Sequence, residues 1–429
     1  MVRDPPRPGH EDDDQGCRRH DAGDDYQRRR GLGLNTSPER ARQALPIPRP
    51  LYLGLAVASI GGPLALAALY LPGAAGSSLP SVGLTTALAA AVFVAPLAVW
   101  LGYSRQVASS GGLAAFVDAA AGRGAAWGQA LVWAVSYFLY LPYTVTYIAY
   151  DLLPIVFPGI GPYRAALELL MPAAITLAVL APIRGLLSGV LALAAAQLAL
   201  MLVLGILEFV HVGAPGSSFV PNTSAHTTAQ ATAAISLLFL CASLPLFFGG
   251  EVQGANRTIR AALLTAFLVV AACTLFAVVP LAAIPQQLRG SAIPGLAIAQ
   301  AYGGRELAIA VGVGTAASVA ALIIIEYLAL GRLAHAMLRT PLRPTLAAIA
   351  VPFIAADAIS LINPQRFYDD LLRVSLVALF LSQLVVFAVY PRFRRIHERL
   401  RPQDLAVAVI ASALMIYGIY TTLTNSGGT

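Results

Sequence analysis

The chain has 429 residues, of which 58% are hydrophobic and 11% are charged, and its mean hydropathy is +0.72. Soluble domains carry about 25% charged residues, so this composition excludes a soluble enzyme or binding module and predicts a multi-pass membrane protein. The formal net charge is +7, and all basic residues except histidine are arginines. This charge does not indicate nucleic-acid binding, because the arginines after residue 50 lie mainly in short loops between apolar segments.

Residues 1–50 hold 10 of the 28 basic and 9 of the 21 acidic residues and few large apolar ones. Such a segment cannot bury a core, so we expect a disordered cytoplasmic tail. It has no apolar stretch typical of a cleavable signal peptide. The three cysteines form no disulfide or metal-site pattern, and we expect no cofactor and no bound metal.

Eleven apolar segments follow the tail, and their lengths and Ala/Leu richness predict helices that cross a bilayer core about 30 Å thick. Strands of a membrane barrel would be about 10 residues long and strictly alternating. The predicted spans cover approximately residues 51–72, 83–103, 125–150, 168–183, 186–212, 230–249, 259–284, 305–331, 344–362, 371–390 and 404–424. Two shorter helices are expected between spans, at 111–122 and 291–302.

The loop arginines predict the orientation in the cell membrane. With the N-terminus in the cytoplasm, the cytoplasmic loops hold 13 arginines and the external loops hold 5, by count over the sequence after the tail. Arginine accumulates in cytoplasmic loops, so we expect a cytoplasmic N-terminus and an external C-terminus.

The first span contains Ser59, Ile60, Gly61, Gly62 and Pro63 in sequence. Glycine disfavours a helix by about 1 kcal/mol and proline lacks the backbone donor. Unpaired backbone groups at membrane depth persist only where protein, a cavity, an ion or a ligand satisfies them. The sequence therefore predicts a broken helix that points to transport, whereas an ordinary proline kink is the alternative.

The sixth span repeats this anomaly, with Cys241 to Pro245 followed by Gly249 and Gly250. Spans one and six correspond if residues 51–213 and 229–391 form two inverted five-helix repeats. Interrupted helices at matching positions indicate a binding site near the bilayer midplane. We therefore predict a transporter core over residues 51–400 and an additional transmembrane helix over 401–429.

This pattern resembles the amino acid–polyamine–organocation superfamily of permeases. The similarity lies in the motifs Ala58–Pro63, Gly111–Gly122, Glu251–Arg260 and Arg332–Met337. It implies an all-α, leucine-transporter-like fold and transport of amino acids or related organic solutes. The chain departs from the family pattern at Gly62 and Pro63, and the family's span-six acid falls among Cys241, Ala242 and Ser243. Gln197 falls near a lysine of some proton-coupled members.

The free ends of two half-helices would together hold a zwitterion. Backbone N–H groups after the first break suit a carboxylate, and carbonyls at the second suit an ammonium group. The tyrosines of span three border this site or form an aromatic belt with core packing. The predicted substrate-binding residues are Ser59, Ile60, Gly61, Gly62, Tyr137, Tyr140, Leu240, Cys241, Ala242 and Ser243.

Coupling to H⁺, coupling to Na⁺ and substrate exchange remain open. The hydroxyl oxygens of Thr315 and Ser318, facing the carbonyls of Val57 and Ile60, suit sodium, although small residues also serve helix packing. Glu326 lies inside span eight and is the candidate for proton coupling; pairing with Arg332 or another arginine of the cytoplasmic side is the structural alternative. Asp357 is expected to cap the outer end of span nine.

Two other classes were compared with a secondary transporter. A membrane-embedded enzyme needs clustered catalytic groups, and the spans contain no His-x-x-x-His, no Gly-x-Ser-x-Gly and no carboxylate cluster. A channel favours rings of charges or carbonyls around a symmetric pore, and no such repetition is visible. The sequence therefore predicts a non-enzymatic secondary transporter.

Overall fold

The computed structural model describes residues 46–424, which are almost entirely helical. Within this range, ten apolar helical segments are long enough to cross a membrane. The first, Arg49–Tyr103, has 55 residues, and a single crossing needs about 20. It therefore supplies two passes, in agreement with the eleven predicted spans. Most of the expected tail, including Cys17, lies outside the described residues.

The first five passes and their connections occupy residues 49–212. They comprise α3 (Arg49–Ala58), α4 (Pro63–Ala65), η2 (Leu66–Tyr70), α5 (Leu71–Ala75), η3 (Gly76–Ser81), α6 (Val82–Tyr103), α7 (Gly112–Ala121), α8 (Arg123–Tyr147), η4 (Ile148–Leu152), α9 (Leu153–Val156), η5 (Pro158–Tyr163), α10 (Arg164–Leu180) and α11 (Ile183–Val212).

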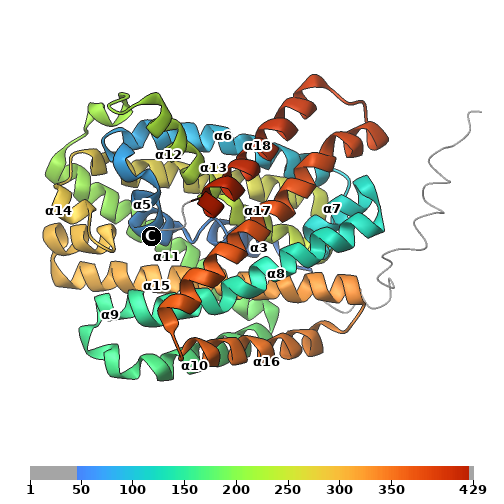
Figure 1. Ribbon diagram of the computed structural model, residues 1–429, viewed down its shortest axis with the longest axis horizontal. Coiled ribbons are helices and arrows are strands. Elements are labelled where there is room, and N and C mark those ends of the chain that lie inside the picture. The colour runs from blue at the N-terminus through green and yellow to red at the C-terminus, as the bar shows by residue number, and fades with distance from the viewer. Residues whose placement is uncertain (1–45, 425–429) are drawn as a thin grey trace, which may run out of the picture. The chain divides into compact units, whose positions relative to one another are not determined.

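The remaining passes occupy residues 216–424. They comprise η6 (Gly216–Phe219), α12 (Ala225–Leu238), η7 (Leu240–Glu251), α13 (Ala255–Val278), η8 (Val279–Ala282), α14 (Gln286–Arg289), α15 (Pro294–Leu338), α16 (Leu342–Ser360), α17 (Pro364–His397) and α18 (Pro402–Thr424). In Figure 1, α10 lies beside α16 and α17 crosses α8, and both pairs are in contact.

Both short helices predicted between spans are present, and positive-φ glycines set their limits. Helix α7 lies between Gly112, with φ of 52°, and Gly122, with φ of 88°. Gly304, with φ of 81° and ψ of −177°, divides α15 into a short helix and the eighth span. Left-handed φ values are open to glycine at little steric cost, which explains why the helices change direction there.

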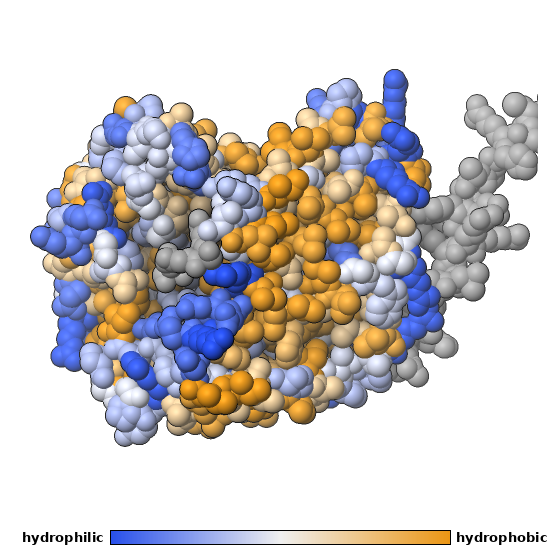
Figure 2. Space-filling view, in the orientation of Figure 1, coloured by the Kyte–Doolittle hydropathy of each residue, from blue (hydrophilic) through white to orange (hydrophobic). Residues whose placement is uncertain are grey.

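The lateral surface is hydrophobic, as a lipid-facing surface requires. Figure 2 shows hydrophobic residues gathered over α17 and α18, with hydrophilic residues towards the ends of the helices. Leu177, Val210 and Val351 are each more than 70% exposed. A soluble protein rarely exposes so much apolar surface, so the chain is a multi-pass membrane protein.

Residues 46–50 were expected to belong to the disordered tail, but they belong to the structured part of the chain. Ile47 is 2% exposed, and its N–H donates to the carbonyl oxygen of Glu251 at 2.8 Å. Helix α3 already begins at Arg49. The apolar side chain of Ile47 and the fixed φ of its proline neighbours explain this early start.

Candidate functional site

The first pass is broken where the glycines predicted it. Helix α3 ends at Ala58 and α4 begins at Pro63, with Gly61 at φ of 63° and Gly62 at φ of 58°. Within the break the N–H of Gly61 donates to the carbonyl of Ser59 at 2.9 Å. Two consecutive left-handed residues cannot continue a right-handed helix, so the chain is unwound over four residues at mid-span.

The unwound turn packs against the eighth pass. A Cβ atom added to Gly62 would lie 2.5 Å from the Ser318 hydroxyl oxygen and 3.0 Å from the Ser318 carbonyl oxygen. That hydroxyl donates to the Gln197 amide oxygen at 2.7 Å and accepts the Ala65 N–H at 3.5 Å. Ser318 therefore joins the break to α11, and only glycine fits at position 62.

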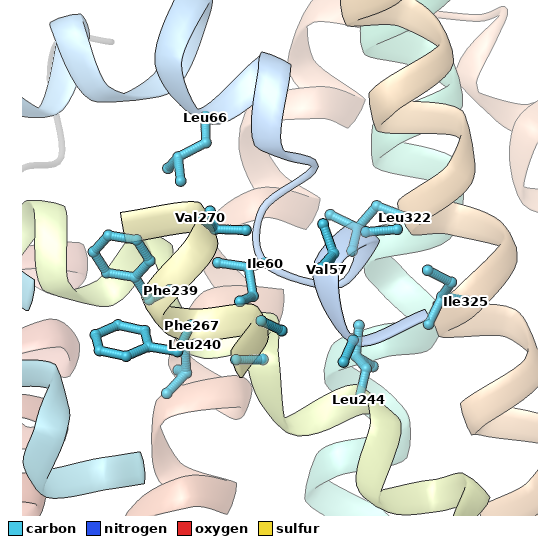
Figure 3. Packing of buried hydrophobic residues seen from close by; sticks show 14 of the residues in the cluster. Val57, Ile60, Leu66, Phe239, Leu240, Leu244, Phe267, Val270, Leu322 and Ile325 are labelled. Carbon is cyan, nitrogen blue, oxygen red and sulfur yellow. The ribbon is translucent and has the colours of Figure 1, made fainter. Parts of the chain in front are cut away.

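The sixth pass is interrupted in another way. Helix α12 ends at Leu238, and a 3₁₀ helix of 12 residues, η7, runs from Leu240 to Glu251 with Pro245 inside it. The tyrosine hydroxyl of Tyr52 donates to the Pro245 carbonyl at 2.9 Å. The predicted interruption is confirmed, but it begins ahead of Cys241 and consists of a tightened helix. Figure 3 shows the unwound chain near Ile60 beside Phe239 and Leu240.

A cavity of about 1220 Å³ lies between the two interrupted passes. Of the predicted substrate-binding residues, the structure brings five to its wall: Gly61, Tyr137, Tyr140, Leu240 and Cys241.

The other five predicted residues lie outside the cavity lining. All five are buried. They are Ser59, Ile60, Gly62, Ala242 and Ser243. The Ser59 hydroxyl donates to the Leu55 carbonyl, and the Ser243 hydroxyl donates to Leu240 and accepts from the Gln383 amide. These residues therefore stabilise the two breaks and do not line the cavity.

Glu326 of α15 also lines the cavity. Its side chain is 0% exposed, and neither carboxylate oxygen has a hydrogen-bond partner among the described residues. The alternative pairing with Arg332 is not found, because Arg332 binds Glu251. A buried carboxyl group that faces a cavity without a partner is typical of a functional group in a membrane protein.

Tyrosines surround this carboxyl group. Tyr70 of η2, which was not among the predicted site residues, lines the cavity with Tyr137 and Tyr140. The only sequence signal for Tyr70 is its place two turns after the glycine break. Tyr143 lies farther along α8, where its hydroxyl donates to that of Tyr368 at 3.0 Å. The predicted tyrosine stripe is therefore divided between cavity lining and helix packing.

The cavity lining reaches the end of the helices at which the first pass ends and α12 begins. Its lining includes Ser77, at the turn after the first pass, and His226, at the start of α12. Helix α18 contributes Tyr417 and Tyr420 at the same end. The additional helix outside the two repeats therefore contributes to the cavity mouth.

A cluster of ionic and aromatic side chains lies towards the opposite end, which carries most loop arginines, and none of its residues lines the cavity. There the Arg332 guanidinium binds both carboxylate oxygens of Glu251, at 2.8 and 2.9 Å, and lies 4.0 Å from the ring centroid of Phe248. Trp133 packs on Phe247 with ring centroids 4.2 Å apart. Bidentate arginine–carboxylate pairs are strong and directional, so this cluster is a plug below the cavity.

The three residues proposed for sodium lie near the first break. Val57 is in the last turn of α3, and Thr315 and Ser318 are buried in α15. The Thr315 hydroxyl donates to the Val311 carbonyl at 2.8 Å. Both hydroxyl oxygens retain lone pairs for a cation, and their protons are already donated within the protein.

Three further carboxyl groups are buried away from the cavity, and one of them is Glu208 of α11, which is 1% exposed. Glu168 of α10 accepts hydrogen bonds from Thr146 and Ser360. Asp357 of α16 is 0% exposed and has no hydrogen-bond partner among the described residues. Asp357 was expected to cap the outer end of its span; it lies in the last turn of α16, but its carboxylate oxygens accept no hydrogen bond among the described residues.

Comparison with known proteins gives a fold and no sequence family. No family model matches the chain, and no curated protein matches it. A solved structure of a manganese transporter from Eremococcus coleocola is 14% identical with a TM-score of 0.58, covering 88% of this chain and 87% of that one. A mutant of the same transporter is 11% identical with a TM-score of 0.62, covering 88% and 87%.

The protein MhsT, solved in complex with L-phenylalanine, is 13% identical with a TM-score of 0.60, covering 87% of this chain and 98% of that chain. Likeness at this level of identity defines the architecture only. The chain thus has an all-α, leucine-transporter-like fold, with a five-plus-five inverted-repeat core and interrupted first and sixth passes.

Proposed function

We propose that this chain is a secondary active transporter that moves a small, amino-acid-like organic solute across the cell membrane by alternating access. One observation carries this proposal: the cavity between the two interrupted passes reaches one end of the helices, whereas the Glu251–Arg332 pair lies at the other end, outside the cavity lining. A site that faces one side at a time is what alternating access requires.

The interrupted passes supply the moving parts. The breaks at Gly61–Gly62 and at Phe239 divide the first and the sixth pass into two halves each. One half of a pass can therefore tilt while the other half stays in place. Rocking of the bundle would part Glu251 from Arg332 and close the mouth near Ser77 and His226. The loop arginines support a cytoplasmic location for the Glu251–Arg332 end, so the structure corresponds to an outward-facing state.

Two coupling routes are compatible with the site. Glu326 binds and releases a proton inside the cavity in the first route. In the second, sodium binds between Val57, Thr315 and Ser318 and stabilises the unwound turn. We also propose membership of the amino acid–polyamine–organocation superfamily, supported by the motif order in the sequence and by the shared fold.

Manganese transport is the second candidate, because one protein of this fold is a manganese transporter. Transition-metal sites combine several carboxylate, imidazole or sulfur ligands. Among residues 46–424 no group of three or more His, Cys, Asp or Glu is placed to hold a metal ion. This observation favours an organic solute over a metal ion.

Uptake by purified protein in liposomes tests the proposal. The panel contains amino acids, amines, neutral solutes and Mn²⁺, each under an imposed proton or sodium gradient. We expect gradient-driven accumulation of at least one organic solute, whereas accumulation of none contradicts the proposal. Accumulation under sodium alone favours the Val57–Thr315–Ser318 route over the Glu326 route.

A further inference from the structure

Among the described residues, the cavity wall carries an acidic side chain and no arginine or lysine. Glu326 is the single carboxylate among the lining residues, no lysine or arginine joins it, and His226 lies at the mouth. Both Glu326 oxygens lack a hydrogen-bond partner among the described residues. An ionised carboxylate buried in this way needs a counter-charge, and no arginine among the described residues that line the cavity supplies one.

The wall offers little to a substrate carboxylate. Pro63 has no N–H, the N–H of Gly61 donates to Ser59, and the N–H of Ala65 is directed at Ser318. Leu66 donates to the carbonyl of Gly62 within the helix. The N–H groups of Gly62 and Leu64 make no hydrogen bond among the described residues, but neither residue lines the cavity. The half-helix that was expected to receive a carboxylate therefore presents no free N–H group at the cavity wall.

Aromatic rings complete the surroundings of Glu326. Tyr70, Tyr137 and Tyr140 come from two different passes and line the same cavity, and Tyr140 lies 5.2 Å from Tyr143 between ring centroids. The tyrosine hydroxyl of Tyr137 points to the Cys241 sulfur at 3.9 Å. Tyrosine faces attract organic cations through their ring quadrupole, and a carboxylate beside such rings adds a direct ion pair.

We propose that the cavity is selective for a small organic amine that carries a net positive charge, with Glu326 as its counter-ion and the rings of Tyr70, Tyr137 and Tyr140 around its ammonium group. This inference rests on the proposed function and narrows its substrate class from amino-acid-like zwitterions to organic cations. The ammonium group supplies the counter-charge that Glu326 lacks.

An alternative assigns Glu326 a proton only, with the solute bound elsewhere in the cavity. The two assignments differ in one measurable respect. If Glu326 is the counter-ion, its replacement by glutamine removes affinity for amines and leaves neutral solutes untouched. If Glu326 carries only a proton, glutamine mimics the protonated state and amine affinity persists.

Matched ligands isolate the role of the substrate carboxylate. Phenethylamine, phenylalanine and 3-phenylpropionate share an aromatic frame, and isopentylamine, leucine and 4-methylpentanoate share a branched aliphatic one. Binding of each to the purified full-length protein is measured by thermal stabilisation, which rises with ligand concentration over Kd. We expect each amine to bind at least about tenfold more tightly than its parent amino acid, a difference of about 1.4 kcal/mol.

The variant E326Q and the matched control D357N complete the experiment. Both replace a buried, unpartnered carboxyl group, but Asp357 lies outside the cavity lining. We expect E326Q to lose amine affinity at least about tenfold and D357N to retain it, since only Glu326 reaches the ligand. Unchanged amine affinity in E326Q, or an amino acid that binds as tightly as its amine, overturns the inference.

If E326Q does not fold, the affinities of the wild-type protein for each amine and its parent amino acid still test the inference. Liposome uptake separates this inference from the proposed function. Accumulation of amino acids without amines keeps the transporter proposal and overturns the organic-cation site. Accumulation of no solute overturns both.

Discussion

The two interrupted passes solve one structural problem by different means. The first pass unwinds over Ser59–Gly62 and needs two glycines with positive φ. The sixth pass tightens into the 3₁₀ helix η7. No residue of η7, from Leu240 to Glu251, has a positive φ. Inverted repeats therefore preserve the position of an interruption, while the local backbone solution differs.

This difference assigns different roles to the two breaks. The first break depends on close approach, because Gly62 lies against Ser318 with no room for a side chain. The sixth break depends on volume, because Phe247 and Phe248 are fully buried and pack against Trp133 and Arg332. Substitutions should therefore act through backbone fit at the first break and through side-chain packing at the second.

The largest effect is expected for Gly62→Ala. A left-handed φ costs a residue with a Cβ about 1–2 kcal/mol, and the overlap with the Ser318 carbonyl oxygen adds about 1–3 kcal/mol. We expect loss of measurable uptake and a lower melting temperature in detergent.

Gly73→Ala is the matched control for this substitution. An added Cβ at Gly73 meets no atom within 4 Å, so stability and uptake should be retained. Wild-type uptake by Gly62→Ala would show that the first break tolerates a side chain, and the contrast between the breaks would fail.

An intermediate effect is expected for Glu251→Gln at the end of η7. The Arg332 side chain is 2% exposed and loses a bidentate partner, at a cost of about 1.5–3 kcal/mol. A change of 1–3 kcal/mol shifts a conformational equilibrium by about 5- to 150-fold. We expect the closed end to open more often.

Cys241, which lines the cavity, reports this change in a background with Cys17→Ser and Cys273→Ser. Thiol labelling of Cys241 from the arginine-rich side should become faster in Glu251→Gln. Arg366→Gln is the control, because its pair with Asp370 is 3.6 Å long and both side chains are more than 70% exposed. Equal labelling rates in wild type and Glu251→Gln would contradict a plug at this end.

The smallest effects are expected for two serines, one at each break. Ser318→Ala removes a hydrogen bond to Gln197, and Ser243→Ala removes one from Gln383. Each loss should lower the free energy of unfolding by about 1–2 kcal/mol. Chemical denaturation measures both costs, and liposome uptake measures the functional difference.

Sodium dependence distinguishes these two serines. If the Val57–Thr315–Ser318 route operates, Ser318→Ala raises the sodium concentration needed for half-maximal uptake and Ser243→Ala does not. The same shift in both variants would show that it arises from general destabilisation. No shift in either would exclude Ser318 as a sodium ligand.

Local sequence signals predicted much of the fold because they depend on near neighbours. Gly61, Gly62 and Pro63 interrupt a helix wherever they occur in it, and residues 53–71 are apolar enough to cross a membrane in any protein. Gly122 likewise ends the short helix that the sequence predicted over 111–122. The prediction for the tail was wrong at Ile47 because its burial depends on Glu251, about 200 residues away along the chain.

The candidate site was predicted in part. Gly61, Tyr137 and Cys241 line the cavity as predicted, whereas Ser59 and Ser243 are buried outside its lining. The helices here are apolar on all sides, so periodicity gives little information about which face of a helix meets a cavity. Tyr70 was missed for that reason.

The sequence by itself determined the membrane class, the number of passes, the two interruptions and the arginine-rich side. These follow from transfer free energies and backbone chemistry, which act locally along the chain. Only the tertiary structure decided that Arg332 pairs with Glu251, that Ser318 pairs with Gln197, and that Glu326 faces the cavity unpaired. Those relations depend on how each helix is rotated against its neighbours, and that rotation is set by packing among distant segments.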